Sequence, residues 1–375
     1  MIAMLTNPAA IIGALMPTFV DAFVARGLDV GTAATLGSIE LFSMAITVVL
    51  APLIVNRWNR RAIALCAILL AAIGQLGSME TADPFAIGIL RMAAGVGEGA
   101  LYAVAVASIA AMAAPDRTFG LAVACNLVTT TALLALIVWY ARSAPAAGAM
   151  LVTGAFVAIH MAFLLALPKH GALPASRQNA PSHRDGPTAS PVAVLSGLLG
   201  MFLLFFGFGL VWPMASQIAA YRGLDADMIA TALSVAGFGG IAGAGVATVL
   251  GLRFGRVLPL VSGTLAMALG LWLIGTNFFV AAALLVMFSW AFNLPYYLGL
   301  MASLDLTGRI AVLTSGMIPF GAAAGQVMAG LIKDGHGFAA VTFCGSAALV
   351  AALAAILHTA TSRTGAPLPA KGQAR

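Results

Sequence analysis

Long apolar runs separated by short polar breaks fill almost the whole chain of 375 residues. The runs match the roughly 20 residues that a helix needs to cross the hydrocarbon core of a bilayer. They are too apolar for the strands of a membrane barrel, in which polar and apolar side chains alternate. The pattern therefore predicts an all-α membrane protein with twelve transmembrane helices, at 3–25, 32–55, 62–79, 85–112, 119–141, 146–167, 193–220, 228–250, 257–275, 278–303, 311–332 and 338–360.

The two halves of the chain repeat each other at an offset of 196 positions. Residues 13–61 align with 209–257 without a gap, and thirteen of the forty-nine positions are identical. The tetrapeptide Arg26-Gly27-Leu28-Asp29 recurs as Arg222-Gly223-Leu224-Asp225 in the same register. Six spans per repeat return the chain to its starting side, so the second copy has the orientation of the first. This parallel arrangement is typical of two-domain transporters in which one half rocks against the other.

The repeat also predicts the domain organisation. We expect a six-helix bundle at 1–167, a cytoplasmic linker at 168–192, a second six-helix bundle at 193–360 and a cytoplasmic tail at 361–375. The linker is rich in Pro and polar residues, which favours a flexible connection. A duplicated channel or a membrane scaffold would show the same repeat, and these remain alternatives.

Charge distribution predicts the orientation of the chain. Hydrophobic residues make up 62% of the sequence and charged residues 8%, whereas about a quarter of the residues of a soluble domain are charged. With both termini inside, thirteen of the eighteen Lys and Arg residues fall in inner segments, where cationic loops are retained. We therefore expect a multi-pass protein of the inner (plasma) membrane with cytoplasmic termini. The net charge of +6 comes from these short loops, so we expect no nucleic-acid partner.

Two motifs resemble those of the major facilitator superfamily (MFS). The segment Arg57-Trp58-Asn59-Arg60-Arg61 resembles its G-x-x-x-D-R-x-G-R-R loop, although Pro52, Asn56 and Asn59 replace the first Gly, the Asp and the second Gly. The segment Arg91-Met92-Ala93-Ala94-Gly95-Val96-Gly97-Glu98-Gly99 resembles its R-x-x-x-G-x-G-x-G motif. The resemblance implies the MFS fold, and it assigns a gating role to the cationic loops and their repeat, which contain Arg57, Arg60, Arg61, Arg253 and Arg256.

Four ionisable side chains lie well inside the predicted spans: Asp21, Glu40, Arg91 and Glu98. Each costs about 2.5–3.5 kcal/mol at mid-membrane on insertion scales, so such residues usually face a cavity or a partner. Asp21, Glu40 and Arg91 fall at similar depth, so Arg91 can pair with either carboxylate. Low dielectric favours a neutral acid and an approaching guanidinium favours the carboxylate. We therefore predict a proton-coupling role for all four, with Glu98 or Asp21 as carrier. A static ion pair, with Glu40 as its structural member, is the alternative.

The second half carries no equivalent charges, because Gln217 stands at the repeat position of Asp21 and Ala236 at that of Glu40. The resemblance places the first, fourth, seventh and tenth helices along the central cavity. Aromatic walls with a few hydrogen-bonding groups are typical of sites for organic molecules. The candidate substrate-binding residues are Arg91 in the first half and, in the second half, Trp212, Gln217, Trp290, Asn293, Tyr296 and Tyr297. The residues of the second half could instead face lipid or pack against other helices.

Other function classes lack their motifs. The sequence contains no Walker A loop, no HExxH and no GxSxG, so we expect neither an enzyme nor ATP-driven transport. Cys66, Cys125 and Cys344 form no metal-binding or disulfide pattern. We expect no cofactor, a proton gradient as the driving force, and a monomer in the lipid bilayer. The sequence favours proton-coupled symport of a small organic anion held by Arg91. The alternatives are proton-antiport efflux of an apolar or cationic compound and a non-transporting scaffold.

Overall fold

The computed structural model describes residues 1–375 except 56, 111, 113–114, 170–189, 305–308 and 362–375. Most of the predicted linker at 168–192 and nearly all of the predicted tail at 361–375 lie outside the described residues. The described part of the chain contains helices and turns but no strand. The predicted all-α class is therefore confirmed.

The described residues of the first half form nine helical elements. A 3₁₀ turn, η1, precedes α1, and the half ends in a second 3₁₀ segment, η2. The elements are η1 Ile2–Thr6, α1 Asn7–Val24, α2 Val30–Leu50, α3 Pro52–Val55, α4 Arg60–Gly77, α5 Pro84–Ala110, α6 Pro115–Ala141, α7 Gly148–Ile159 and η2 His160–Ala166.

The second half differs from the first at the repeated proline. Pro17 lies inside the continuous helix α1, whereas Pro213, its repeat partner, lies in the 3₁₀ turn η3 that separates α9 from α10. The elements are α9 Pro191–Val211, η3 Trp212–Met214, α10 Ala215–Tyr221, α11 Ala226–Leu250, α12 Val257–Leu273, α13 Phe279–Ala302 and α14 Arg309–Thr361.

Ten helices of the described residues are long and apolar enough to cross a membrane. A further apolar helix, α12, has 17 residues and covers most of the predicted span 257–275. The longest helix, α14, has 53 residues and covers both predicted spans 311–332 and 338–360. Gly337 interrupts it with a φ of 79° and a ψ of 177°, which is a non-helical conformation. This break falls between the two predicted spans.

The repeated tetrapeptide forms the same turn in both halves. Gly27 and Gly223 have φ values of 89° and 80°, in the left-handed region that glycine adopts without strain. Two residues later Asp29 accepts a hydrogen bond from the Thr32 amide and Asp225 one from the Asp227 amide, each at 3.0 Å. Both aspartates cap the following helix. We call the end of the bundle that carries these two turns the turn end.

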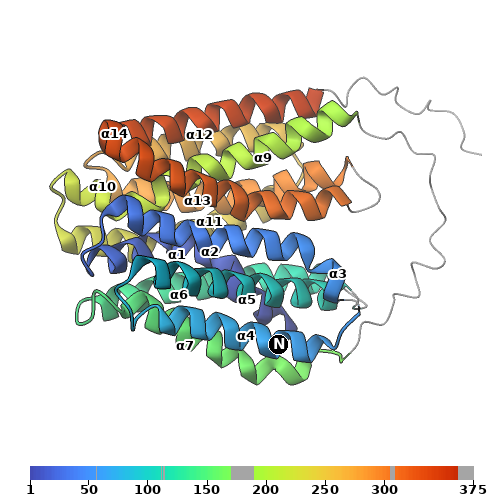
Figure 1. Cartoon of the computed structure of the whole chain (residues 1–375). Helices are drawn as coiled ribbons and strands as arrows, with labels where there is room; N and C mark the ends of the chain where they lie inside the picture. The colour runs from blue at the N-terminus through green and yellow to red at the C-terminus, as the bar shows by residue number, and fades with distance from the viewer. Residues whose placement is uncertain (56, 111, 113–114, 170–189, 305–308, 362–375) are drawn as a thin grey trace, which may run out of the picture.

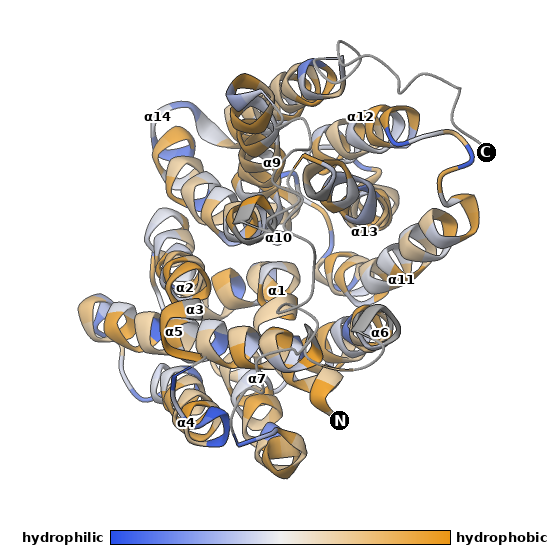
Figure 2. Cartoon of the chain, turned by 90° about the vertical axis from the view of Figure 1, so that its right-hand side faces the viewer, coloured by the Kyte–Doolittle hydropathy of each residue, from blue (hydrophilic) through white to orange (hydrophobic). Residues whose placement is uncertain are grey.

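The two halves pack as neighbouring bundles (Figure 1). In the view along the helices, α4, α5 and α7 lie on one side and α9, α12 and α13 on the other, with α1 and α2 between them (Figure 2). Small residues allow the bundles to meet: a Cβ on Gly330 of α14 would lie 3.1 Å from the Gly31 Cα of α2. On the other flank, a Cβ on Gly237 of α11 would collide with Thr131 of α6. The seam therefore depends on glycine at both flanks.

Large apolar side chains cover the outside of the bundle. Phe85, Leu165 and Val249 are 76%, 78% and 71% exposed. Patches of this kind are rare on soluble monomers but suit contact with lipid tails. Polar side chains such as Gln75 and Asn293 are instead fully buried. The chain is accordingly a multi-pass membrane protein.

Candidate functional site

The centre of the first half contains a buried ion pair. Arg91 of α5 donates from Nη1 to Glu40 Oε2 of α2 at 3.0 Å, and neither side chain is exposed. The sequence left open whether Arg91 pairs with Asp21 or Glu40, and the structure selects Glu40. Breaking such a pair by removing one partner usually costs about 3–5 kcal/mol, because it leaves an uncompensated buried charge.

Three further acceptors, all on α4 or at its end, complete the shell of Arg91. Its Nε donates to the Ser78 hydroxyl at 3.2 Å, and its Nη2 donates to the Gly74 carbonyl at 3.1 Å and to Gln75 Oε1 at 2.9 Å. The Phe19 ring of α1 lies 5.2 Å from the guanidinium carbon, within cation–π range. Four of the five N–H groups of a guanidinium are thereby engaged. Arg91 ties α1, α2, α4 and α5 together.

Gln75 connects this ion pair to the second buried glutamate. Its Nε2 donates to Glu40 Oε1 at 2.7 Å and to Glu98 Oε1 at 2.9 Å. Arg91 and Glu98 are therefore linked through Gln75. The other oxygen, Glu98 Oε2, is buried without a hydrogen-bond partner among the described residues. Two carboxylates close to a single guanidinium carry a net charge of −1 in a buried site, and a bound proton would neutralise it.

The glycines of the R-x-x-x-G-x-G-E-G segment bring these groups together. A Cβ on Gly95 would collide with the Glu40 carbonyl, and one on Gly97 would collide with the Ala67 carbonyl of α4. Glycine at both positions allows α5 to approach α2 on one face and α4 on another. This close approach brings Arg91 and Glu98 within reach of Glu40 and Gln75.

Asp21 belongs to a different site, at the seam between the halves. Its Oδ1 accepts hydrogen bonds from the Ser216 hydroxyl at 2.5 Å and from Gln217 Nε2 at 2.7 Å. Asp21 and Gln217 occupy equivalent positions of the repeat. All three residues line a cavity of about 340 Å³ between α1, α6 and α7 of the first half and α10 and α11 of the second. The four predicted coupling residues thus divide into a sealed group of three and one carboxylate at an inter-half cavity.

The predicted substrate residues of the second half do not share one cavity. Gln217 lines the inter-half cavity, whereas Trp212 and Tyr297 are fully buried and donate to the carbonyls of Ala14 and Gly197. Tyr296 is also buried, and its hydroxyl lies 3.3 Å from the Ala247 carbonyl of α11.

The two remaining candidates lie on α13. Asn293 is fully buried beside Gly263 of α12, and neither of its amide atoms has a hydrogen-bond partner among the described residues. Trp290 is half-buried against the core. Neither lines the inter-half cavity.

Three of the five predicted gating arginines contact residues of their own halves. Arg60 is buried, with its Nη1 3.3 Å from the Ser108 hydroxyl of α5, and Arg61 donates to the carbonyls of Leu165 and Leu167 of the sixth span. Arg57 and Arg253 are exposed. The Arg256 side chain reaches Gly299 of α13. Asn56, the substituted position of the loop motif, lies outside the described residues.

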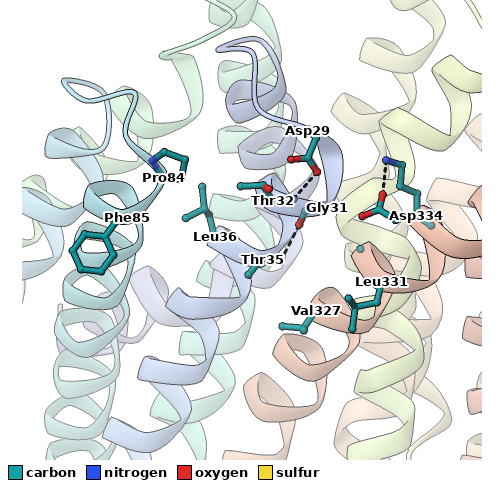
Figure 3. A pocket seen from close by; sticks show the side chains of 12 residues that line it. Asp29, Gly31, Thr32, Thr35, Leu36, Pro84, Phe85, Val327, Leu331 and Asp334 are labelled. Atoms are coloured by element: carbon teal, nitrogen blue, oxygen red, sulfur yellow. Dashed lines mark hydrogen bonds and ion pairs between the residues drawn. The ribbon is translucent and has the colours of Figure 1, made fainter.

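A second hollow lies at the turn end of the seam between α2 and α14 (Figure 3). It has a volume of about 680 Å³ and is lined by Asp29, Thr32 and Thr35 on α2 and its cap, and by Val327 and Asp334 on α14. Hydrogen bonds from Thr32 lower the pKa of Asp29. These groups already serve as a helix cap and in the ion pair between Lys333 and Asp334 at 2.9 Å. The hollow therefore offers few free polar groups.

Sequence reasoning did not single out Gln75 or Ser216. Gln75 is the one amide in an otherwise apolar predicted span, 62–79, and a buried polar side chain needs partners. That rule could have marked it. Ser216 precedes Gln217 in the sequence but carries no pattern of its own, so only the fold reveals that it contacts Asp21.

Comparisons with known proteins identify the fold. No protein-family model and no curated protein sequence matches the chain. The crystal structure of a D-xylose-proton symporter superposes with a TM-score of 0.73 at 15% identity, over 98% of this chain and 95% of that one. The xylose transporter XylE from E. coli, in a partially occluded inward open conformation, gives a TM-score of 0.72 at 16% identity, over 95% and 96%. A mutant of the nucleoside transporter NupG gives 0.71 at 13% identity, over 96% and 98%. The chain shares its fold with these transporters along nearly its whole length.

Proposed function

We propose that this chain, which has the MFS fold, is a secondary active transporter that moves a small solute across the inner membrane by alternating access. Counting α12 and dividing α14 at Gly337 gives twelve spans. An even number places both termini on one side, and the cationic loops favour the cytoplasm for that side. The turn end then faces outward.

The packing suits rocking of one half against the other. Buried hydrogen bonds of Arg91 and Gln75 join α2, α4 and α5 within the first half. The halves meet through glycine contacts, through the hydrogen bonds of Asp21 with Ser216 and Gln217 and of Trp212 with the Ala14 carbonyl, and through apolar packing that includes the Phe42–Phe320 ring contact. Such rigid-body motion around a midplane site is how two-domain transporters work.

The observation that carries proton coupling is the amide bridge of Gln75 between Glu40 and Glu98. Arg91 balances one carboxylate, and a proton on the other would remove the remaining charge. Glu98 is the proposed carrier, because Arg91 pairs with Glu40 and one oxygen of Glu98 has no partner among the described residues. Any motion that parts Glu98 from Gln75 or admits water would change its proton affinity.

We propose symport, in which the proton and the solute move in the same direction, in line with the D-xylose-proton symporter that shares the fold. The organic anion favoured by the sequence depended on Arg91 as an anchor. In the structure Arg91 has no exposed surface and already donates to four acceptors. A substrate carboxylate would have to displace Glu40. The residues that line the inter-half cavity are therefore a better basis for inferring the class of substrate.

The test is solute-driven proton uptake in proteoliposomes. Sugars, nucleosides, amines and carboxylates are added one at a time outside, and external pH is recorded. We expect at least one solute to alkalinise the outside, and Glu98→Gln to abolish this signal. Glu80→Gln is the matched control, because Glu80 is an exposed glutamate.

Two results would count against the proposal. Accumulation of a solute without proton movement in the wild type would remove the coupling. Movement of none of these solutes under any imposed gradient would favour a scaffold.

A further inference from the structure

The inter-half cavity has the size and composition of a small-molecule site. Its volume of about 340 Å³ lies at the lower end of the range for ligand pockets. Its apolar walls include Ile137, Val138 and Leu233, and its polar lining includes Thr18, Asp21 and Gln217. Both halves contribute, so a bound solute would contact the two bodies that move in alternating access.

The hydrogen bonds already made in the cavity determine what a ligand can meet. The Ser216 hydroxyl donates to Asp21 Oδ1, and the Thr18 hydroxyl donates to the Leu15 carbonyl at 2.7 Å. A hydroxyl has a single proton, so both offer only lone pairs to a ligand.

The carboxylate also fixes the Gln217 amide. Its Nε2 must point at Asp21 Oδ1, because two facing oxygens would repel. The Gln217 Oε1 atom and Asp21 Oδ2 accept no hydrogen bond in the described part of the chain. Apart from the second amide proton of Gln217, the polar groups around Asp21 are therefore acceptors.

The remaining charges of the lining do not reverse this character. Arg142 and Asp227 lie 3.9 Å apart with side chains that are 65% and 87% exposed. Their opposite charges therefore offset each other at a solvent-exposed position. Counting Asp21 as ionised, the lining carries one more negative charge than positive charges. An anion beside Asp21 would meet a carboxylate and several lone pairs, and the cationic N–H donors of the lining belong to the exposed Arg142.

We infer that this cavity binds a small solute rich in O–H or N–H donors and free of negative charge, such as a polyol or an amine. The inference rests on the proposed transport function and supplies its substrate class. It replaces the organic anion predicted from the sequence, because the donors of Arg91 are occupied elsewhere and the groups around Asp21 are acceptors.

Cysteine labelling tests the class without knowledge of the natural solute. Native Cys66, Cys125 and Cys344 are replaced by Ala, and Ala220→Cys or Ala230→Cys places a thiol in the cavity lining. The purified protein in detergent is treated with aminoethyl, hydroxyethyl or sulfonatoethyl methanethiosulfonate. We expect the first two reagents to react at least about tenfold faster than the anionic one, from the field of one partly buried carboxylate. Asn277→Cys places a thiol in an exposed turn outside the cavity, and its reaction rates serve as the reference for the three reagents.

Variants of the carboxylate link the selectivity to Asp21. Asp21→Asn should bring the three rates close together at both cysteines and leave those of Asn277→Cys unchanged. Monodisperse elution and a cooperative melt establish that each variant is folded. If Asp21→Asn fails this criterion, Ser216→Ala and Gln217→Leu, which leave the carboxylate in place, should keep the anionic reagent slow.

Three outcomes would overturn the inference. The anionic reagent reacts as fast as the others, or neither cavity cysteine reacts while Asn277→Cys does, or Asp21→Asn leaves the selectivity intact. Labelling needs no membrane and no gradient, so its failure is distinct from failure of the proposed transport. Proton-coupled uptake of an anion would leave the transport function standing and reject this substrate class.

Discussion

Asp21 and Gln217, which stand at equivalent positions of the two halves, hydrogen bond to each other at 2.7 Å across the seam. Equivalent residues of a parallel repeat meet only where they lie close to the axis that relates the halves. A carboxylate on one side and an amide on the other make this contact attractive, whereas two carboxylates would repel. The acid in one copy and the amide in the other therefore favour closure of the seam.

A charge swap across the seam tests this relationship. Gln217→Glu should lower the thermal stability of the purified protein at pH 8, because two carboxylates then face each other. The cost should be about 1–3 kcal/mol, the penalty for a buried polar group without a partner. Acidification should relieve it, since protonation removes the repulsion. The double variant Asp21→Asn with Gln217→Glu should recover stability at pH 8, and a double variant no better than the single one would contradict the pairing.

The buried ion pair predicts a second double-variant result. Arg91→Met should destabilise the protein by about 3–5 kcal/mol, because Glu40 is left charged and buried. Adding Glu40→Gln should restore much of the loss. Unfolding in denaturant, followed by circular dichroism, measures both. Equal stability of the single and double variants would show that Glu40 is not the partner that matters.

The glycine motif of α5 predicts a packing defect. Gly95→Ala should destabilise the protein by about 1–3 kcal/mol, because the added Cβ collides with the Glu40 carbonyl and Ser43 and pushes α5 from α2. Gly245→Ala is the matched control, since a Cβ there meets nothing within 4 Å. That change should be neutral or slightly stabilising, because alanine favours a helix. Similar melting temperatures for the two variants would count against close packing at Gly95.

Arg26, in the turn of the first half, should contribute more to stability than its repeat partner Arg222. The Arg26 guanidinium donates to the carbonyls of Ser78, Met79 and Thr81 at the end of α4, where a positive charge also favours the helix dipole. Its repeat partner Arg222 is exposed. Arg26→Ala should therefore lower the melting temperature more than Arg222→Ala. Equal shifts would mean that the three carbonyl contacts contribute nothing.

Much of the fold follows from the sequence by simple physics. Apolar runs of bilayer length dictate helices, because the hydrocarbon core offers no other partner to backbone N–H and C=O groups. The repeated turn around Gly27 and Gly223 is also predictable, since only glycine takes the left-handed conformation without strain. The cost of charge in lipid identified Asp21, Glu40, Arg91 and Glu98 as candidates. These inferences need only local composition and spacing.

Pairing of the charges was decided by the tertiary structure alone. Depth in the membrane left Asp21 and Glu40 as equal partners for Arg91. The side of the helix on which each residue lies, and the close packing through Gly95 and Gly97, select Glu40. The same packing adds Gln75 to the network and leaves Asp21 for Gln217. Hydrogen bonds are short and directional, so which donor meets which acceptor depends on helix contacts that no single segment encodes. The sequence thus determined which groups are buried, and only the fold decided which of them remain free to bind.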